Sequence, residues 1–197
     1  MFRSAVTVGD ATPQDAEALV SVWGGLTDRT AEGGATPLAV QDAAAAIARI
    51  AADPDARLLV ARVDDKVAGA VHLSRAPLSP LHTDSAIYVL HLQVIESSRR
   101  HGVGRALMEA TVTWAEEKDT SHVVAAASVS SRDANRFMAR LGLAQLATLR
   151  GATVPALRAK LPVEPPAAAR VGSRSHRNVG QVLAQRRSQR RSQSRSS

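Results

Sequence analysis

The chain has 197 residues, of which 45% are hydrophobic and none is cysteine, and its formal net charge is +7. The lack of cysteine excludes a disulfide framework, a thiolate nucleophile and a zinc–thiolate cluster. No apolar run reaches the roughly 18 residues of a membrane-spanning helix, and no secretory signal is recognisable, so we expect a cytoplasmic protein.

The excess positive charge is confined to the C-terminal end. Residues 164–197 hold eight arginines and one acidic residue, Glu164, whereas basic and acidic residues each number 17 in residues 1–163. The C-terminal segment is rich in serine, arginine and glutamine, and its apolar surface is too small to offset the entropy lost on ordering. We therefore predict a domain over residues 1–163 and a disordered basic tail over residues 164–197.

Apolar periodicity and turn residues predict the elements of the first half of the chain. These are a short strand within residues 1–8, a helix at 14–23, a mobile glycine-rich loop at 24–37, an alanine-rich helix at 38–52, and strands at 57–63 and 67–74. The polar turn Asp64-Asp65-Lys66 joins the last two, which indicates an antiparallel hairpin.

The second half of the chain alternates strands and helices. A strand at residues 87–95 precedes an amphipathic helix that ends near Glu117, and a strand at 122–128 precedes a helix at 132–141. Because a strand, helix and strand in succession form a right-handed crossover, the two strands should lie parallel. Residues 143–150 and 154–161 are predicted to form a terminal strand pair.

Two glycines, Gly102 and Gly104, lie at the junction of the strand at 87–95 and the following helix. Glycine allows a tight turn there and leaves the first N–H groups of the helix open to an anion. A Rossmann dinucleotide site would need a third glycine three positions further on, where this chain has Leu107. The pattern favours a pyrophosphate site of another kind.

The pattern Arg99-x-x-Gly102-x-Gly104 after a strand resembles the acetyl-CoA signature of the GCN5-related N-acetyltransferase (GNAT) superfamily. The order of predicted elements is also similar over about residues 3–162. The resemblance implies an α/β fold with a mixed, mostly antiparallel sheet, a central splayed strand pair and flanking helices. It also implies an acetyl-CoA-dependent N-acetyltransferase in which the acceptor amine attacks the thioester directly, without a metal.

The resemblance further implies where the cofactor binds. The backbone of the splayed strand would pair with the pantetheine arm, the turn would hold the pyrophosphate, and the start of the last helix would touch the arm. The matching residues in this chain are Leu92, Gln93 and Val94 on the strand, Arg99, Arg100, His101, Gly102, Val103, Gly104 and Arg105 in the turn, and Ser131 before the last helix.

The residues that would move protons depart from the family pattern. The tyrosine that usually protonates the departing thiolate is replaced by Met138, which has no proton to give. Tyr88 occupies the position of a catalytic glutamate found in some members, and His91 titrates in a suitable range. We predict Tyr88 and His91 as the candidate catalytic residues, with His72 and Glu96 as weaker candidates.

Two alternative functions remain open. Met138 and the lack of an obvious carboxylate base are compatible with a weakly active or inactive CoA-binding regulatory protein. The basic tail is compatible with a nucleic-acid-associated module that binds by charge, since it has no aromatic residue to stack on bases. The partners considered are an amine acceptor, a second copy of the chain in a homodimer, and a polyanion held by the tail.

Overall fold

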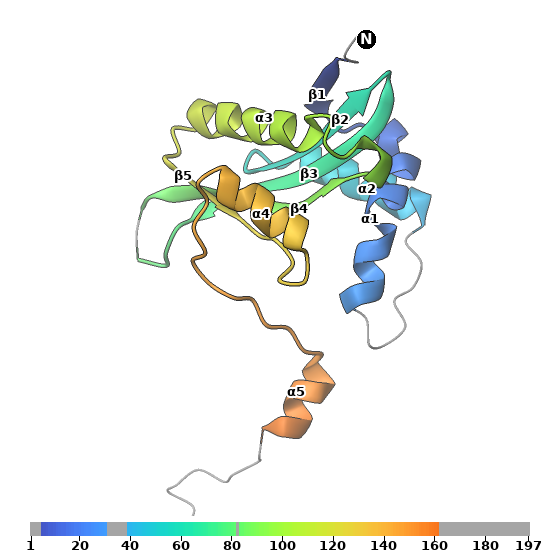
Figure 1. The fold of residues 1–197 in the computed structure, drawn as a ribbon. Helices are drawn as coiled ribbons and strands as arrows, with labels where there is room; N and C mark the ends of the chain where they lie inside the picture. Colours follow the sequence, from blue (N-terminus) through green and yellow to red (C-terminus); the bar gives the residue numbers. More distant parts are fainter. Residues whose placement is uncertain (1–4, 31–38, 82, 162–197) are drawn as a thin grey trace, which may run out of the picture. The chain divides into compact units, whose positions relative to one another are not determined.

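The computed structural model describes residues 5–30, 39–81 and 83–161 (Figure 1). The predicted tail at 164–197 and residues 31–37 of the predicted loop lie outside the described residues. The structure divides the chain into two compact units, Met1–Gln145 and Leu146–Ser197. The sheet and helices α1 to α4 all belong to the first.

The first unit is built on a five-stranded sheet in the order β1-β2-β3-β4-β5. Its strands are β1 (Val6–Asp10), β2 (Ala56–Val63), β3 (Lys66–Pro77), β4 (Ser85–Val94) and β5 (His122–Ala125). Neighbouring strands from β1 to β4 pair antiparallel, and β4 pairs with β5 in parallel. The predicted mixed, mostly antiparallel sheet is confirmed.

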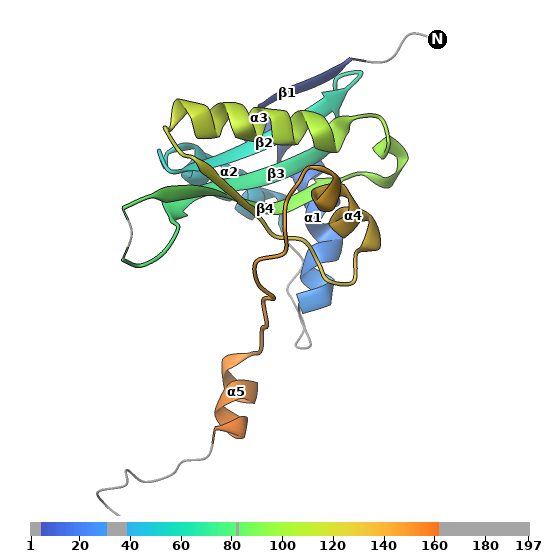
Figure 2. The same ribbon diagram turned by 60° about the vertical axis from the view of Figure 1, so that its left-hand side comes forward.

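Helices cover both faces of this sheet (Figures 1 and 2). They are η1 (Pro13–Asp15), α1 (Ala16–Thr30), α2 (Val40–Ala51), η2 (Glu96–Ser98), α3 (Val103–Glu117) and α4 (Arg132–Arg140). One apolar cluster joins the sheet to α3, and a second joins its other face to α1 and α2. None of the described helices is long and apolar enough to cross a bilayer.

Helix α1 is longer than predicted. It continues from Ala16 through the glycine pair at residues 24–25 to Thr30, where we expected a loop. A glycine in a helix costs about 1 kcal/mol relative to alanine, which the packing of the rest of a helix can outweigh. The predicted loop is therefore wrong over residues 24–30.

The hairpin between β2 and β3 forms as predicted. Asp64 and Asp65 both have positive φ, at 49° and 60°. Two consecutive left-handed residues make the tight turn whose twist matches that of paired strands, and aspartate tolerates this conformation better than most residues.

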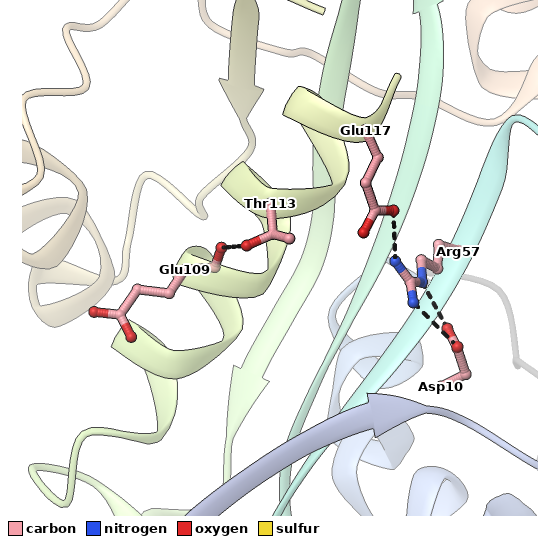
Figure 3. Close-up of polar contacts among 5 residues, drawn as sticks. All are labelled: Asp10, Arg57, Glu109, Thr113 and Glu117. Carbon is pink, nitrogen blue, oxygen red and sulfur yellow. Dashed lines mark hydrogen bonds and ion pairs between the residues drawn. The ribbon is translucent and has the colours of Figure 1, made fainter. Parts of the chain in front are cut away.

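An arginine on β2 fixes the C-terminal end of α3 (Figure 3). Arg57 donates from Nε to Asp10 Oδ1 over 2.7 Å and from Nη2 to Asp10 Oδ2 over 3.1 Å, and its Nη1 lies 3.6 Å from Glu117 Oε2. A carboxylate in the last turn of a helix is unfavourable beside the negative end of the helix dipole, and Arg57 offsets it. The hydrogen bond from Arg57 lowers the pKa of Asp10, although burial acts in the opposite direction.

The predicted terminal strand pair is wrong. Residues 143–153 have no regular secondary structure, and α5 (Val154–Lys160), in the second unit, is a helix. Thr153 caps α5 by accepting a hydrogen bond from Ala156 N, and Pro155 suits its first turn. The segment is rich in residues of high helix propensity, and the apolar spacing that we took for a strand does not outweigh that propensity.

Candidate functional site

Strand β4 is interrupted by a bulge at His91. The φ of His91 is 53°, in the left-handed region that residues with a side chain rarely adopt. The register of β4 on β3 shifts between Ala70 and His72, so two residues of β4, His91 and Leu92, stand opposite Val71. A bulge of this kind bends the strand and redirects its side chains.

Helix α1 holds this bulge through Trp23. The indole Nε1 of Trp23 donates a hydrogen bond to the backbone carbonyl oxygen of His91 over 2.8 Å. The bulge disrupts the regular ladder at this residue, and the tryptophan supplies a donor to its carbonyl. Sequence reasoning missed Trp23, because a tryptophan in an amphipathic helix is indistinguishable from an ordinary core residue.

Strand β5 accompanies only the first half of β4. Residues 86–89 pair with residues 122–125, and Ala126 N donates to Val89 O over 3.0 Å. Beyond Val89, β4 continues to Val94 with no strand on that side in the described part of the chain. The two strands therefore separate. Apart from the His91 carbonyl, which Trp23 occupies, the outer backbone edge of β4 beyond Val89 can pair with an extended ligand.

Of the predicted cofactor residues of the strand, Leu92 and Val94 lie along this free edge, whereas the carbonyl of Gln93 faces β3. The side chains of Leu92 and Val94 pack against the apolar cluster under α3, so their backbone groups are the parts open to a ligand. The carbonyl oxygen of Gln93 lies only 2.7 Å from where a Cβ on Gly69 of β3 would stand. Gly69 is a second residue that we missed, and an isolated glycine within a strand is the available signal of such close backbone approach.

The turn after β4 leads directly into the N-terminus of α3. Arg100 and Gly102 have positive φ, at 66° and 87°. The first backbone bond of the helix runs from Ala106 N to Gly102 O over 2.9 Å. The N–H groups of residues 103–105 have no acceptor within the described residues, and together with the helix dipole they form an anion site.

Cationic side chains surround this N-terminus. Arg99, Arg100, His101 and Arg105 are all exposed. Arg105 Nε donates to Glu109 Oε1 over 2.8 Å, which raises the pKa of Arg105. Arg99 Nη1 lies 3.8 Å from Glu96 Oε1, a longer ion pair. Because exposed ion pairs of this kind contribute little to stability, these side chains can turn toward an anion at a small cost in free energy.

The ring of Phe137 on α4 lies over Gly104. A Cβ added to Gly104 would stand 3.4 Å from Phe137 Cζ and 3.7 Å from Val94 Cγ2. Any side chain larger than alanine at this position would have to displace the ring or extend over the turn. The buried Val103 beside it, 1% exposed, anchors the start of α3 in the core.

The titratable candidates lie on the opposite side of β4 from α3. Tyr88 is partly buried, and its Oη donates to Pro77 O over 3.2 Å. His91 is exposed at the bulge, and His72 on β3 pairs with Leu90 next to it. Tyr88 and His91 are three positions apart, which in a regular strand would place them on opposite faces. The bulge breaks that alternation.

The environment of His72 favours its neutral form. Burial lowers the pKa of its imidazole, and the positive charge of nearby His91 lowers it further. No group of three or more histidine, cysteine, aspartate or glutamate residues that could hold a metal ion exists in the described residues.

Comparison with known families identifies the family. The model of the acetyltransferase (GNAT) family matches residues 28–143, more than half of the chain. The chain belongs to the GNAT family. A search of curated proteins gave no significant match.

Solved structures share the GNAT fold at low sequence identity. A transcriptional regulator from Bacillus halodurans C-125 has a TM-score of 0.62 and 22% identity, covering 76% of this chain and 99% of its own. The ribosomal-protein-alanine N-acetyltransferase from Brucella melitensis biovar Abortus 2308 has a TM-score of 0.58 and 23% identity, over 76% and 98%. The aminoglycoside N-acetyltransferase AAC(6')-Iy, solved with CoA, has a TM-score of 0.60 and 14% identity, over 76% and 95%.

The start of α4, which the resemblance predicts to touch the cofactor arm, makes hydrogen bonds within its own segment. Ser131 Oγ accepts a hydrogen bond from Ala134 N over 3.3 Å. Asn135 Nδ2 donates to the carbonyl oxygens of Ser128 and Ser131 over 2.8 and 2.7 Å. The hydroxyl proton and the second lone pair of Ser131 remain available for a contact with a cofactor.

Met138 on α4 is buried, with 8% of its surface exposed. It therefore serves as an apolar packing residue in place of the family's tyrosine, and any proton for a leaving thiolate must come from another group.

Proposed function

We propose that this GNAT protein is an acetyl-CoA-dependent N-acetyltransferase that transfers the acetyl group to an amine by direct attack. The observation that carries the proposal is the junction of β4 and α3. There, free N–H groups at a helix N-terminus follow directly after a strand whose outer backbone edge is free.

The turn is suited to the pyrophosphate of CoA. The N–H groups of residues 103–105 supply donors that need no rearrangement, and Arg99, Arg100 and His101 supply positive charge. A carboxylate or a neutral ligand would use only part of this set. The family match and the neighbour solved with CoA support the same choice of ligand.

The free edge of β4 is suited to the amide-rich pantetheine arm. Backbone groups of residues 92–94 would pair with the arm as a further strand does with a sheet. This arrangement would bring the thioester near the bulge, where a backbone N–H near Val94 would stabilise the oxyanion that forms during attack.

The acceptor amine would approach from the opposite side of the splayed pair, where Tyr88 and His91 lie. The amine nitrogen forms a bond to the thioester carbon and gives up one proton, the carbon–sulfur bond breaks, and CoA leaves as a thiolate that takes up a proton. Holding both reactants in one site supplies much of the rate increase. Acetyltransferases of aminoglycosides and of a ribosomal protein alanine are among the similar structures, which supports an amine acceptor.

Thermal unfolding with and without acetyl-CoA tests the cofactor assignment. A ligand that binds only the folded protein raises its melting temperature, so the parent should show a concentration-dependent rise. Gly104→Glu should lose this rise, because its side chain meets Phe137 and places a negative charge at the anion site. Gly151→Glu is the matched control, since nothing lies within 4 Å of a Cβ at Gly151. Equal shifts in all three proteins would contradict the assignment.

The buried Met138 favours one other candidate function, a CoA-binding protein with little or no turnover. Release of CoA thiol in the presence of acetyl-CoA and an amine panel separates the two. Binding without release for any amine would favour the regulatory protein.

A further inference from the structure

The three middle strands of the sheet carry no carboxylate. The sequences of β2, β3 and β4 contain neither aspartate nor glutamate. A glutamate base on the sheet, which would be the simplest way to deprotonate an amine, is therefore unavailable. The titratable side chains of β3 and β4 beside the bulge are His72, Tyr88 and His91.

His72 is the best placed of these three. It lies between β2 and β4, opposite Leu58 on one side and Leu90 on the other, and Leu90 directly precedes the bulge at His91. It shares its strand face with Ala70, which is buried against α1 and α2. His72 itself is only half-buried, so the two helices leave part of the imidazole accessible beside the bulge.

The other two groups are less suited to take a proton. Tyr88 already donates its proton to Pro77 O, and an ordinary tyrosine remains protonated to about pH 10. His91 is exposed on a bulged backbone, so solvent competes for its ring.

The charges around His72 favour its neutral form. Burial lowers the pKa of His72, and the charge of His91 lowers it further. Leu58 on β2 and Leu90 on β4, which stand opposite His72, carry no charge. The charged side chains of α1 and α2 whose surroundings are described, Glu17, Asp42 and Arg49, are exposed. The imidazole is thus unprotonated near neutral pH, as a base must be.

We propose that His72, beside the bulge of β4, is the general base that removes the proton from the acceptor amine. This assignment rests on the proposed N-acetyltransferase function. As the amine nitrogen bonds to the thioester carbon, one amine proton passes to the imidazole of His72. The carbon–sulfur bond breaks, and the imidazolium then returns a proton, directly or through water, to the thiolate. The products are the N-acetyl amine and CoA thiol.

Turnover against pH tests the proposal. Acetyl-CoA is the donor, and the acceptors are free amino acids, peptides with a free N-terminus, amino sugars and polyamines, with thiol release as the readout. His72→Gln should lower kcat/KM by about 100-fold and remove the acid limb of its pH profile. His91→Gln should keep that limb but move it to higher pH, because loss of the positive neighbour raises the pKa of His72. His122→Gln, exposed on β5, should match the parent.

The outcomes separate this proposal from the proposed function. A parent that binds acetyl-CoA and acetylates an amine, with His72→Gln equal to it in rate and profile, would overturn the role of His72 alone. A parent that does not bind acetyl-CoA, or binds it and acetylates nothing, would overturn the proposed function. NMR titration of the His72 ring gives a readout independent of turnover. Its pKa should lie below the ordinary histidine value and rise in His91→Gln, and an unchanged value would refute the coupling.

Discussion

The indole of Trp23 on α1 and the backbone carbonyl of His91 on β4 are joined by a 2.8 Å hydrogen bond. The two residues are 68 positions apart in sequence. The bond links the helix on one face of the sheet to the residue whose backbone bends the candidate catalytic strand. The bulge is thus stabilised by a residue outside the β3–β4 pair in which it lies.

Trp23→Phe should remove this support while it keeps most of the aromatic surface. The carbonyl of His91 then loses its donor, and since solvent can partly replace it, we expect a loss of about 1 kcal/mol in unfolding free energy. Turnover should fall, because the bulge orients His91 beside His72, while acetyl-CoA affinity should hardly change. Denaturant unfolding and separate kcat and KM values measure this. Ser21→Ala, exposed on the same helix, is the control. An equal fall in turnover and stability in both variants would contradict a specific role of the Trp23–His91 hydrogen bond.

Gly69→Ala should disturb the same region from β3. The added Cβ would lie 2.7 Å from Gln93 O and 2.9 Å from Val103 Cγ1, so the backbone of β4 must move. We expect a cost of about 2 kcal/mol and weaker acetyl-CoA binding, since β4 and the start of α3 both shift. Gly9→Ala is the control, because nothing lies within 4 Å of a Cβ there. Equal melting temperatures for the two variants would show that the sheet accommodates the added methyl group without loss of stability, and would contradict this prediction.

The sequence predicted those parts of the fold that depend on local patterns. The hairpin at Asp64 and Asp65, the helix after Gly104 and the parallel pair of β4 and β5 follow from turn chemistry, periodicity and the crossover rule. The helix α5 was missed because apolar spacing in a short segment fits a strand or a helix equally well.

The supports of the candidate site were missed for a different reason. Trp23, Gly69 and Phe137 act through contacts with residues distant in sequence, and nothing in their immediate neighbours marks them. The bulge at His91 likewise depends on the register between two strands, which a single strand sequence does not reveal.

Acid should destabilise the fold partly through Asp15. Burial raises the pKa of Asp15, but hydrogen bonds from Thr12 and Arg62 outweigh it and leave the pKa lowered. Because the folded pKa lies below the unfolded one, the stabilisation is present above about pH 4 and is lost as pH falls through the folded pKa. Asp15→Asn should therefore be less stable than the parent at pH 7, with a difference that shrinks below pH 4.

Unfolding free energies from pH 7 to pH 3 measure this difference. Asp42→Asn, at an exposed site on α2, is the control and should run parallel to the parent. A constant gap between Asp15→Asn and the parent at every pH would refute the linkage.

Deletion of residues 164–197 should leave acetyl-CoA binding and transfer intact, since the whole predicted site lies before them. It should remove salt-sensitive binding to polyanions, because eight arginines are lost with one acidic residue. Retention on a heparin column at rising salt, compared between the two proteins, measures the second effect. A large loss of transfer activity would instead make the tail part of the site.

Tyr88→Phe tests whether the phenol assists the proton transfer assigned to His72. The hydroxyl of Tyr88 donates to Pro77 O over 3.2 Å, so it can accept a hydrogen bond from an acceptor group or a water molecule. If it positions such a group, Tyr88→Phe should lower kcat by about tenfold with acetyl-CoA affinity unchanged. The acid limb of the pH profile should stay where it is, because a phenol does not titrate in that range. Turnover against pH, with acetyl-CoA affinity measured separately, gives both values. A shift of the acid limb in Tyr88→Phe would mean that the phenol affects the pKa of the His72 imidazole. An unchanged rate would mean that Tyr88 has only a structural role, through its hydrogen bond to Pro77 at the end of β3.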